Sequence, residues 1–289
     1  MSVRIITAAF CGIDGIIVSV EIDISNGLPS FNIVGLADIS VKESKERVRS
    51  AIINSGFEFP VSRITINLAP ADLRKEGSQF DLPIAIGILI ATDQVKFNDL
   101  DNFLFMGELS LSGDLKKIKG ALPIVMEGAK NNIKNYIVPN GNVRECSIVK
   151  NSNIYPFENL NQAAAFLENK DMMPFSLQED NDKKESLYSY DFEDVIGQDS
   201  SKRAVEIAAA GGHNILFFGP PGSGKSMIAH RIPSILPKLN YEEALEVTKI
   251  YSICGSLKEE ALVLHRPFRS PHHTSSNEAV IFWGAMPKP

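Results

Sequence analysis

Apolar and polar residues alternate in short segments through the first 170 residues, and the period of the pattern changes between two and about 3.6 residues. Over residues 15–24 the apolar side chains fall on every second position, which predicts a half-buried strand. The same criteria predict further strands over Ser30–Val34 and over residues 63–68, 103–111 and 136–139.

Helical spacing appears between these strands. In residues 40–55 the apolar residues share one face, with Ser40 as the expected N-cap, Glu43 as its capping-box partner and Gly56 as the stop. Residues 81–91 are nearly all apolar and predict a second, buried helix. Two more helices are predicted over residues 123–131 and 159–168. The mixture predicts an α+β domain with its own core over residues 1–170.

The pattern is lost over residues 171–190, which have no apolar period and predict an acidic, solvated linker. Order is expected to resume at Asp191, with a helix over residues 200–210 that ends at Gly211 and Gly212. A buried strand is predicted over residues 214–218, and a helix from Met227 to Arg231 that Pro233 bends or breaks. Residues 191–289 therefore predict a second domain, of the α/β class.

A phosphate-binding loop lies between that strand and that helix. It consists of Gly219, Pro220, Pro221, Gly222, Ser223, Gly224, Lys225 and Ser226, which fit G-x-x-x-x-G-K-[ST]. Such a loop turns backbone N–H groups toward the β- and γ-phosphates, and the helix N-terminus adds positive potential. Lys225 would contact phosphate oxygens, and the Ser226 hydroxyl would ligate Mg²⁺. The sequence therefore predicts binding of ATP with Mg²⁺.

Hydrolysis in such proteins also requires an acidic residue at the end of a second strand, which holds the metal and helps to orient water. No hydrophobic run ending in Asp-Glu occurs between Ser226 and Pro289. We therefore identify no catalytic residue, expect poor hydrolysis, and expect the chain to be a fragment of a longer protein.

Composition restricts the possible partners and location. The net charge of −6 argues against a general polyanion binder, so contact with nucleic acid would need a local basic patch. Three scattered cysteines suit a reducing compartment. The longest apolar run, residues 82–91, is shorter than the roughly 18 residues of a membrane span. We expect a cytoplasmic protein without membrane contact.

Several segments carry a resemblance to a known family. Residues 191–198, Gly211-Gly212-His213-Asn214 and the phosphate-binding loop resemble AAA+ ATPases of the magnesium-chelatase subunit I type. Residues 266–274 are similar to a signature of that group and of its YifB/ComM branch. Residues 31–36, 43–49 and 67–77 resemble the domain that opens YifB/ComM proteins.

The resemblance implies a Lon protease-like N-terminal domain followed by the first part of a P-loop AAA+ domain. It also implies that Val195 and Ile196 line the adenine pocket. The family is implied to form ATP-driven hexameric rings, and its ComM members to act on DNA by moving branched intermediates in recombination and natural transformation. Arg266 and Arg269 could contact DNA or a neighbouring subunit, or could have a structural role.

A Lon-type peptidase would need a serine activated by a lysine. Alignment on Lys75-Glu76-Gly77 places Gln79 at the serine position, or Ser78 with a one-residue slip. The lysine position is occupied by Leu122, so we expect a non-proteolytic interaction or assembly domain.

Two alternatives remain open. The first is an insertase motor of the magnesium-chelatase type, which the N-terminal domain disfavours. The second is a non-enzymatic nucleotide-binding or assembly fragment, which the missing acidic strand favours. Residues 279–284 also depart from the family, because bulky side chains stand where its members are rich in glycine.

Overall fold

The computed structural model describes residues 2–169, 171–176, 188, 190–257 and 260–271, which form two compact units. Within these residues the first unit contains residues up to 176 together with residues 249–261. The second contains residues 188–248 and 262–271.

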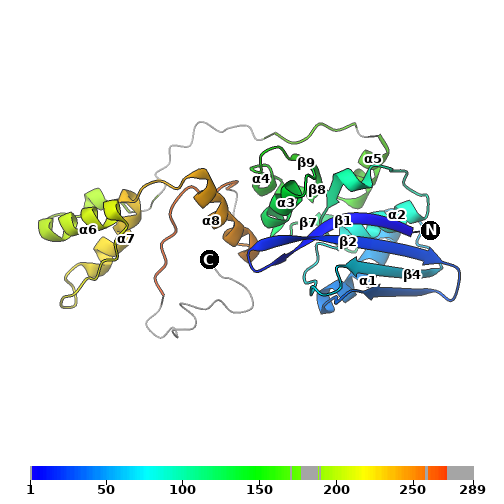
Figure 1. Cartoon of the computed structure of the whole chain (residues 1–289), viewed down its shortest axis with the longest axis horizontal. Coiled ribbons are helices and arrows are strands. Elements are labelled where there is room, and N and C mark those ends of the chain that lie inside the picture. Colours follow the sequence, from blue (N-terminus) through cyan, green and yellow to red (C-terminus); the bar gives the residue numbers. More distant parts are fainter. Residues whose placement is uncertain (1, 170, 177–187, 189, 258–259, 272–289) are drawn as a thin grey trace. The chain divides into compact units, whose positions relative to one another are not determined.

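The first unit is built on a seven-stranded sheet (Figure 1). Its order is β3 (Ser30–Val34), β4 (Arg63–Ala69), β2 (Asp14–Ser25), β1 (Ser2–Cys11), β5 (Phe103–Phe105), β8 (Asn135–Pro139) and β9 (Asn153–Phe157). The pairs β3–β4, β1–β5, β5–β8 and β8–β9 are parallel, whereas β1–β2 and β2–β4 are antiparallel. The unit is therefore mixed α/β with a mostly parallel sheet. A Lon-like relationship stays a prediction.

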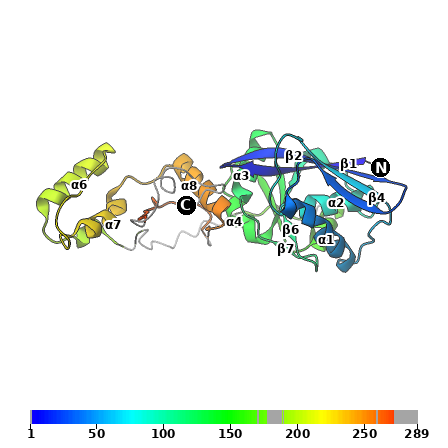
Figure 2. The same ribbon diagram turned by 90° about the horizontal axis from the view of Figure 1, so that it is seen from below.

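Helices pack on the two faces of this sheet and form separate cores. α1 (Ile39–Asn54), α2 (Asp81–Ala91) and α5 (Leu160–Asn169) share one core with residues such as Ile5 and Val20. α3 (Ala121–Lys130) and α4 (Val143–Cys146) share the other with Ile6 and Ala8. Figure 2 shows α1 and α2 below strands β1 and β2. Because successive side chains of β1 point to opposite faces, this one strand contributes to each core.

Two local predictions in this unit are wrong. α1 is capped by Asp38 instead of Ser40, because the Asp38 carboxylate accepts the Val41 N–H at 2.9 Å. The strand expected over residues 103–111 is divided into β5 and β6 (Glu108–Leu109), and β6 pairs with β7 (Leu115–Lys116). The division occurs at Gly107, whose N–H donates to the Gln79 carbonyl and so leaves the sheet.

Several elements were not predicted from the sequence, whereas the predicted bounds of others agree with the structure. The sequence pattern missed the strands β1, β7 and β9, the helices α4 and α8 (Tyr241–Cys254), and the 3₁₀ helices η1 (Leu100–Asn102) and η2 (Asn140–Asn142). The predictions for β2, β3, β4, α2, α3, β8 and α5 are confirmed within two residues at each end.

The second unit contains η3 (Phe192–Asp194), α6 (Asp199–Gly211), α7 (Lys225–Ile235) and the first half of α8. Its core consists of Phe192, Val195, Val205 and Ile228. The strand predicted over residues 214–218 is wrong, since these residues have no strand partner among the described part of the unit. Leu216 and Phe218 are correspondingly uncovered, 90% and 99% exposed, whereas Phe217 is half-buried against the core of the unit.

Candidate nucleotide-binding site

The phosphate-binding loop leads directly into α7. Gly222 and Gly224 have φ angles of 79° and 85°, a left-handed conformation that favours glycine. Gly224 is the N-cap residue of α7, and no side chain in the described part of the chain caps this end of the helix. The first N–H groups of α7 therefore provide donors and positive potential for an anion.

The Lys225 ammonium is folded over this loop. It donates to the Gly219 carbonyl at 2.8 Å, the Pro220 carbonyl at 2.7 Å and the Ser223 hydroxyl at 3.2 Å. All three acceptors are neutral, and no ion pair of Lys225 occurs among the described residues. Its charge is thus available to a phosphate, and the neighbouring Ser226 is exposed, as a metal ligand would need to be. The residues of the loop therefore suit a nucleotide that is bound together with Mg²⁺.

A hydrogen bond connects the segment before α6 to the loop. The Gln198 side-chain amide donates to the Ser223 carbonyl at 3.4 Å. Val195, expected beside the adenine, is 1% exposed and belongs to the core, whereas Ile196 is 93% exposed. Their assignment to an adenine pocket stays a prediction. Gln198 ends the family-like segment of residues 191–198, but the sequence pattern assigned it no contact with the loop.

Other contacts hold α7 in place. The Ser234 hydroxyl accepts the Phe192 N–H at 2.9 Å, and Arg231 lies 3.4 Å from the Asp194 carboxylate. The Arg231 guanidinium also lies over the Tyr190 ring, 5.1 Å from its centroid. These contacts hold α7, the helix that follows the loop, against η3 and Tyr190.

Part of the signature at residues 266–274 is described. Arg266 donates to the Pro237 carbonyl at 2.7 Å and pairs with Glu243 at 3.5 Å. Phe268 packs against His230 with ring centroids 4.6 Å apart. Residues 272–274, like the departure at residues 279–284, lie outside the described residues.

The residues aligned with a peptidase site make other contacts. The Ser78 hydroxyl donates to the Glu108 carboxylate. Gln79 is buried and donates its amide to the Glu76 carbonyl at 2.9 Å, and Leu122 is fully buried. Lys75 is buried with its ammonium donating to the Pro70 carbonyl, and this burial lowers its pKa. Within the described residues, no lysine is hydrogen-bonded to Ser78. The absence of peptidase activity stays a prediction.

Two family models match this chain. "Subunit ChlI of Mg-chelatase" matches residues 20–142, and "Magnesium chelatase, subunit ChlI" matches residues 191–289.

Alignments with known proteins include both of these regions. The chain is 44% identical over 290 residues to "Uncharacterized protein YifB" of Escherichia coli and 42% identical over 300 residues to "Competence protein ComM" of Haemophilus influenzae. Each alignment covers 100% of this chain and 57% of the relative. A shorter alignment matches the chain to "Archaeal Lon protease" of Thermoplasma acidophilum with 41% identity over 54 residues. It covers 19% of this chain and 8% of that relative.

Proposed function

Because this chain belongs to the magnesium-chelatase subunit ChlI family together with YifB and ComM, we propose that it binds ATP with Mg²⁺ in the loop of residues 219–226. The observation that carries the proposal is the Lys225 ammonium, held over the loop by three neutral acceptors. A cation without a carboxylate partner is electrostatically suited to the phosphates of a nucleotide.

Lys225, Ser226 and the backbone N–H groups have different parts in binding. The Lys225 ammonium exchanges the Gly219 and Pro220 carbonyls for phosphate oxygens, which are stronger acceptors because they are charged. Backbone N–H groups at the start of α7 donate to the same phosphates. The Ser226 hydroxyl would hold Mg²⁺, which would supply neutralisation of the phosphate charge. Val195 and Ile196 are the proposed adenine contacts.

The wider role follows from the relatives and is also a proposal. We propose a part in DNA processing, specifically branch migration during recombination and natural transformation, in the cytoplasm. The similarity to "Competence protein ComM" supports the link to competence. We propose self-association into a hexameric ring and a Lon-like, non-proteolytic N-terminal domain, the latter supported by the short archaeal Lon alignment. No helix among the described residues is long and apolar enough to cross a membrane.

Turnover is proposed to be slow in the 289-residue chain. The loop positions the nucleotide and neutralises its charge, but no hydrophobic run ending in Asp-Glu follows Ser226 in this sequence. An arginine supplied by a neighbouring subunit accounts for about 10³ to 10⁵ in rate in related NTPases, and none is identified here.

The test is fluorescent ATP binding in the presence of Mg²⁺. Lys225→Ala removes the principal cation facing the phosphates, so binding should be lost. Lys238→Ala, an exposed lysine beyond α7, is the matched control and should bind as the unchanged chain does. Binding that survives Lys225→Ala contradicts the site. Steady-state hydrolysis at about 10 per second, an ordinary enzyme rate, contradicts the slow turnover alone.

A further inference from the structure

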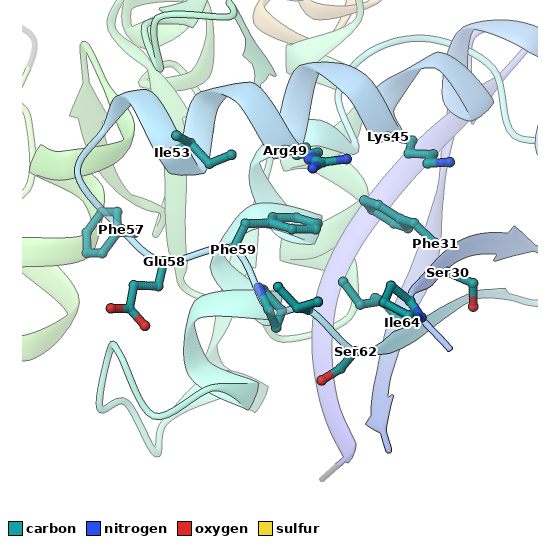
Figure 3. A pocket seen from close by; sticks show the side chains of 13 residues that line it. Ser30, Phe31, Lys45, Arg49, Ile53, Phe57, Glu58, Phe59, Ser62 and Ile64 are labelled. Atoms are coloured by element: carbon teal, nitrogen blue, oxygen red, sulfur yellow. The ribbon is translucent and has the colours of Figure 1, made fainter. Parts of the chain in front are cut away.

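A groove in the first unit lies far along the sequence from the nucleotide loop. It encloses about 540 Å³ between α1 and the segment that connects α1 to β4, a volume within the range of ligand sites. Figure 3 shows Lys45, Arg49 and Ile53 on successive turns of α1, facing the rings of Phe31 and Phe59. The cavity therefore combines an aromatic floor with two cations.

The aromatic floor is preformed. The rings of Phe31 and Phe59 pack with centroids 6.0 Å apart at an interplanar angle of 33°. The Arg49 guanidinium lies over Phe59, 5.6 Å from its centroid, which fixes the cation beside the apolar surface. Among the described residues neither Lys45 nor Arg49 forms an ion pair. The groove thus offers apolar surface bordered by two cations that form no ion pair among the described residues.

One wall of the groove is the start of β3, at the edge of the sheet. The Ser30 N–H donates toward β4, to the Ser62 carbonyl at 3.3 Å. Because N–H directions alternate along a strand, those of Phe31 and Ile33 face the open edge, where no strand of the described residues pairs with them. Such an edge can accept a further strand.

Exposed aliphatic side chains line the groove itself. Val61 is 82% exposed and Ile53 50%, and Leu28, which is close in sequence to the start of β3, is 89% exposed. Aliphatic surface of this kind favours a polypeptide over a nucleic acid, because nucleobases bind by stacking on flat rings and phosphates by charge. The cations then select carboxylates over ammonium groups in that polypeptide.

We propose that this groove is a docking site for an extended acidic peptide of a partner protein, which adds to β3 as an edge strand. Its backbone pairs with Phe31 and Ile33, an apolar side chain enters the Phe31–Phe59 pocket, and carboxylates contact Lys45 and Arg49. Main-chain pairing gives affinity in such complexes, and pockets for alternate side chains give specificity. The Glu58 carboxylate lies at the opposite end of the groove and disfavours peptides that are acidic throughout (Figure 3).

Binding is tested by fluorescence anisotropy with the whole chain and a labelled peptide of alternating aspartate and phenylalanine. Arg49→Glu should weaken binding at least tenfold, which is ~1.4 kcal/mol. Lys42→Glu makes the same charge change on an exposed position of α1 outside the groove and should have a smaller effect. Equal effects of the two variants, or equal binding of a lysine–phenylalanine peptide, would overturn the proposal, as would no binding at all.

The mode of binding is tested by amide hydrogen exchange with the same peptide. Exchange should slow at Phe31 and Ile33, whereas Asn32, which faces β4, should be unaffected. Binding without protection at Phe31 and Ile33 overturns strand addition. Tighter, Arg49-dependent binding of oligothymidylate, or self-association that Arg49→Glu abolishes, would assign the groove to nucleic acid or to a second copy. The Lys225→Ala chain should bind the peptide normally, so failure of the nucleotide site leaves this test intact.

Discussion

The two units use similar apolar residues to different effect. In the first, side chains from strands and helices enclose each other, and residues such as Ile66 and Leu68 on β4 are fully buried. In the second, the apolar run before the phosphate-binding loop leaves Leu216 and Phe218 almost completely exposed. An apolar sequence therefore specifies a buried strand only where neighbouring strands satisfy its backbone and cover its side chains.

The charged groups of the two units differ in the same way. Arg47 donates to the Asp81 carboxylate at 2.7 Å and 3.0 Å, and Asp81 is completely buried. Among the described residues, Lys225 has only neutral acceptors at the surface of the loop. The Arg47 charge is neutralised by an internal ion pair, whereas the Lys225 charge is available to a ligand.

The sharpest test of this contrast is Arg47→Ala. Removing the guanidinium leaves the Asp81 carboxylate buried with no cation, which costs about 3–5 kcal/mol. The loss is measured from hydrogen exchange of β4 amides, and Lys42→Ala on the same helix should change it by less than about 0.5 kcal/mol. A loss below 1 kcal/mol would mean that the ion pair is not the anchor of α1 and α2.

A paired truncation tests the apolar side of the contrast. Ile66→Ala in β4 removes buried methyl groups and should cost about 2–5 kcal/mol, because the core relaxes only in part. Leu216→Ala removes a side chain that is already in solvent and should change the free energy of unfolding by less than about 0.5 kcal/mol. Hydrogen exchange in each unit gives the two values. A large loss for Leu216→Ala would show that residues 214–218 are covered in solution.

Local patterns were sufficient for much of the first unit. The prediction of Ser30–Val34 matches β3 because alternation and flanking turn residues are both short-range signals. β1 was missed because Ile5 and Ile6 are buried on opposite faces, so the strand has no polar alternation. Asp38 and Ser40 are both capping residues, and only the structure shows that Ser40 instead accepts the Gly77 N–H.

In the candidate site, too, residues that are contiguous in sequence were predicted and contacts between distant segments were not. Lys225 and Ser226 were found by spacing, because the loop motif is contiguous in sequence. Gln198 contacts the loop across 25 residues of sequence, and the groove of Phe31, Arg49 and Phe59 is assembled from three segments. Contacts that depend on how segments pack leave no local pattern to recognise.

A smaller effect than that of Arg47→Ala or Ile66→Ala is expected in the part of α8 that belongs to the first unit. Lys249 donates to the Asp14 carboxylate at 2.8 Å, and this hydrogen bond lowers the pKa of Asp14. Asp14 is 64% exposed, so Lys249→Ala should cost only about 0.2–1 kcal/mol, the range of exposed ion pairs.

The pH dependence identifies the cause of that loss. Because the folded-state pKa of Asp14 is lowered, its contribution is complete above the unfolded value of about 3.9 and disappears as pH falls through the folded value. The unchanged chain and Lys249→Ala should therefore differ in stability at pH 7 and converge in acid. Carboxyl NMR titration should show the Asp14 pKa rising in the variant. A stability difference that persists at the acid end would assign the loss to packing of the lysine stem instead of its charge.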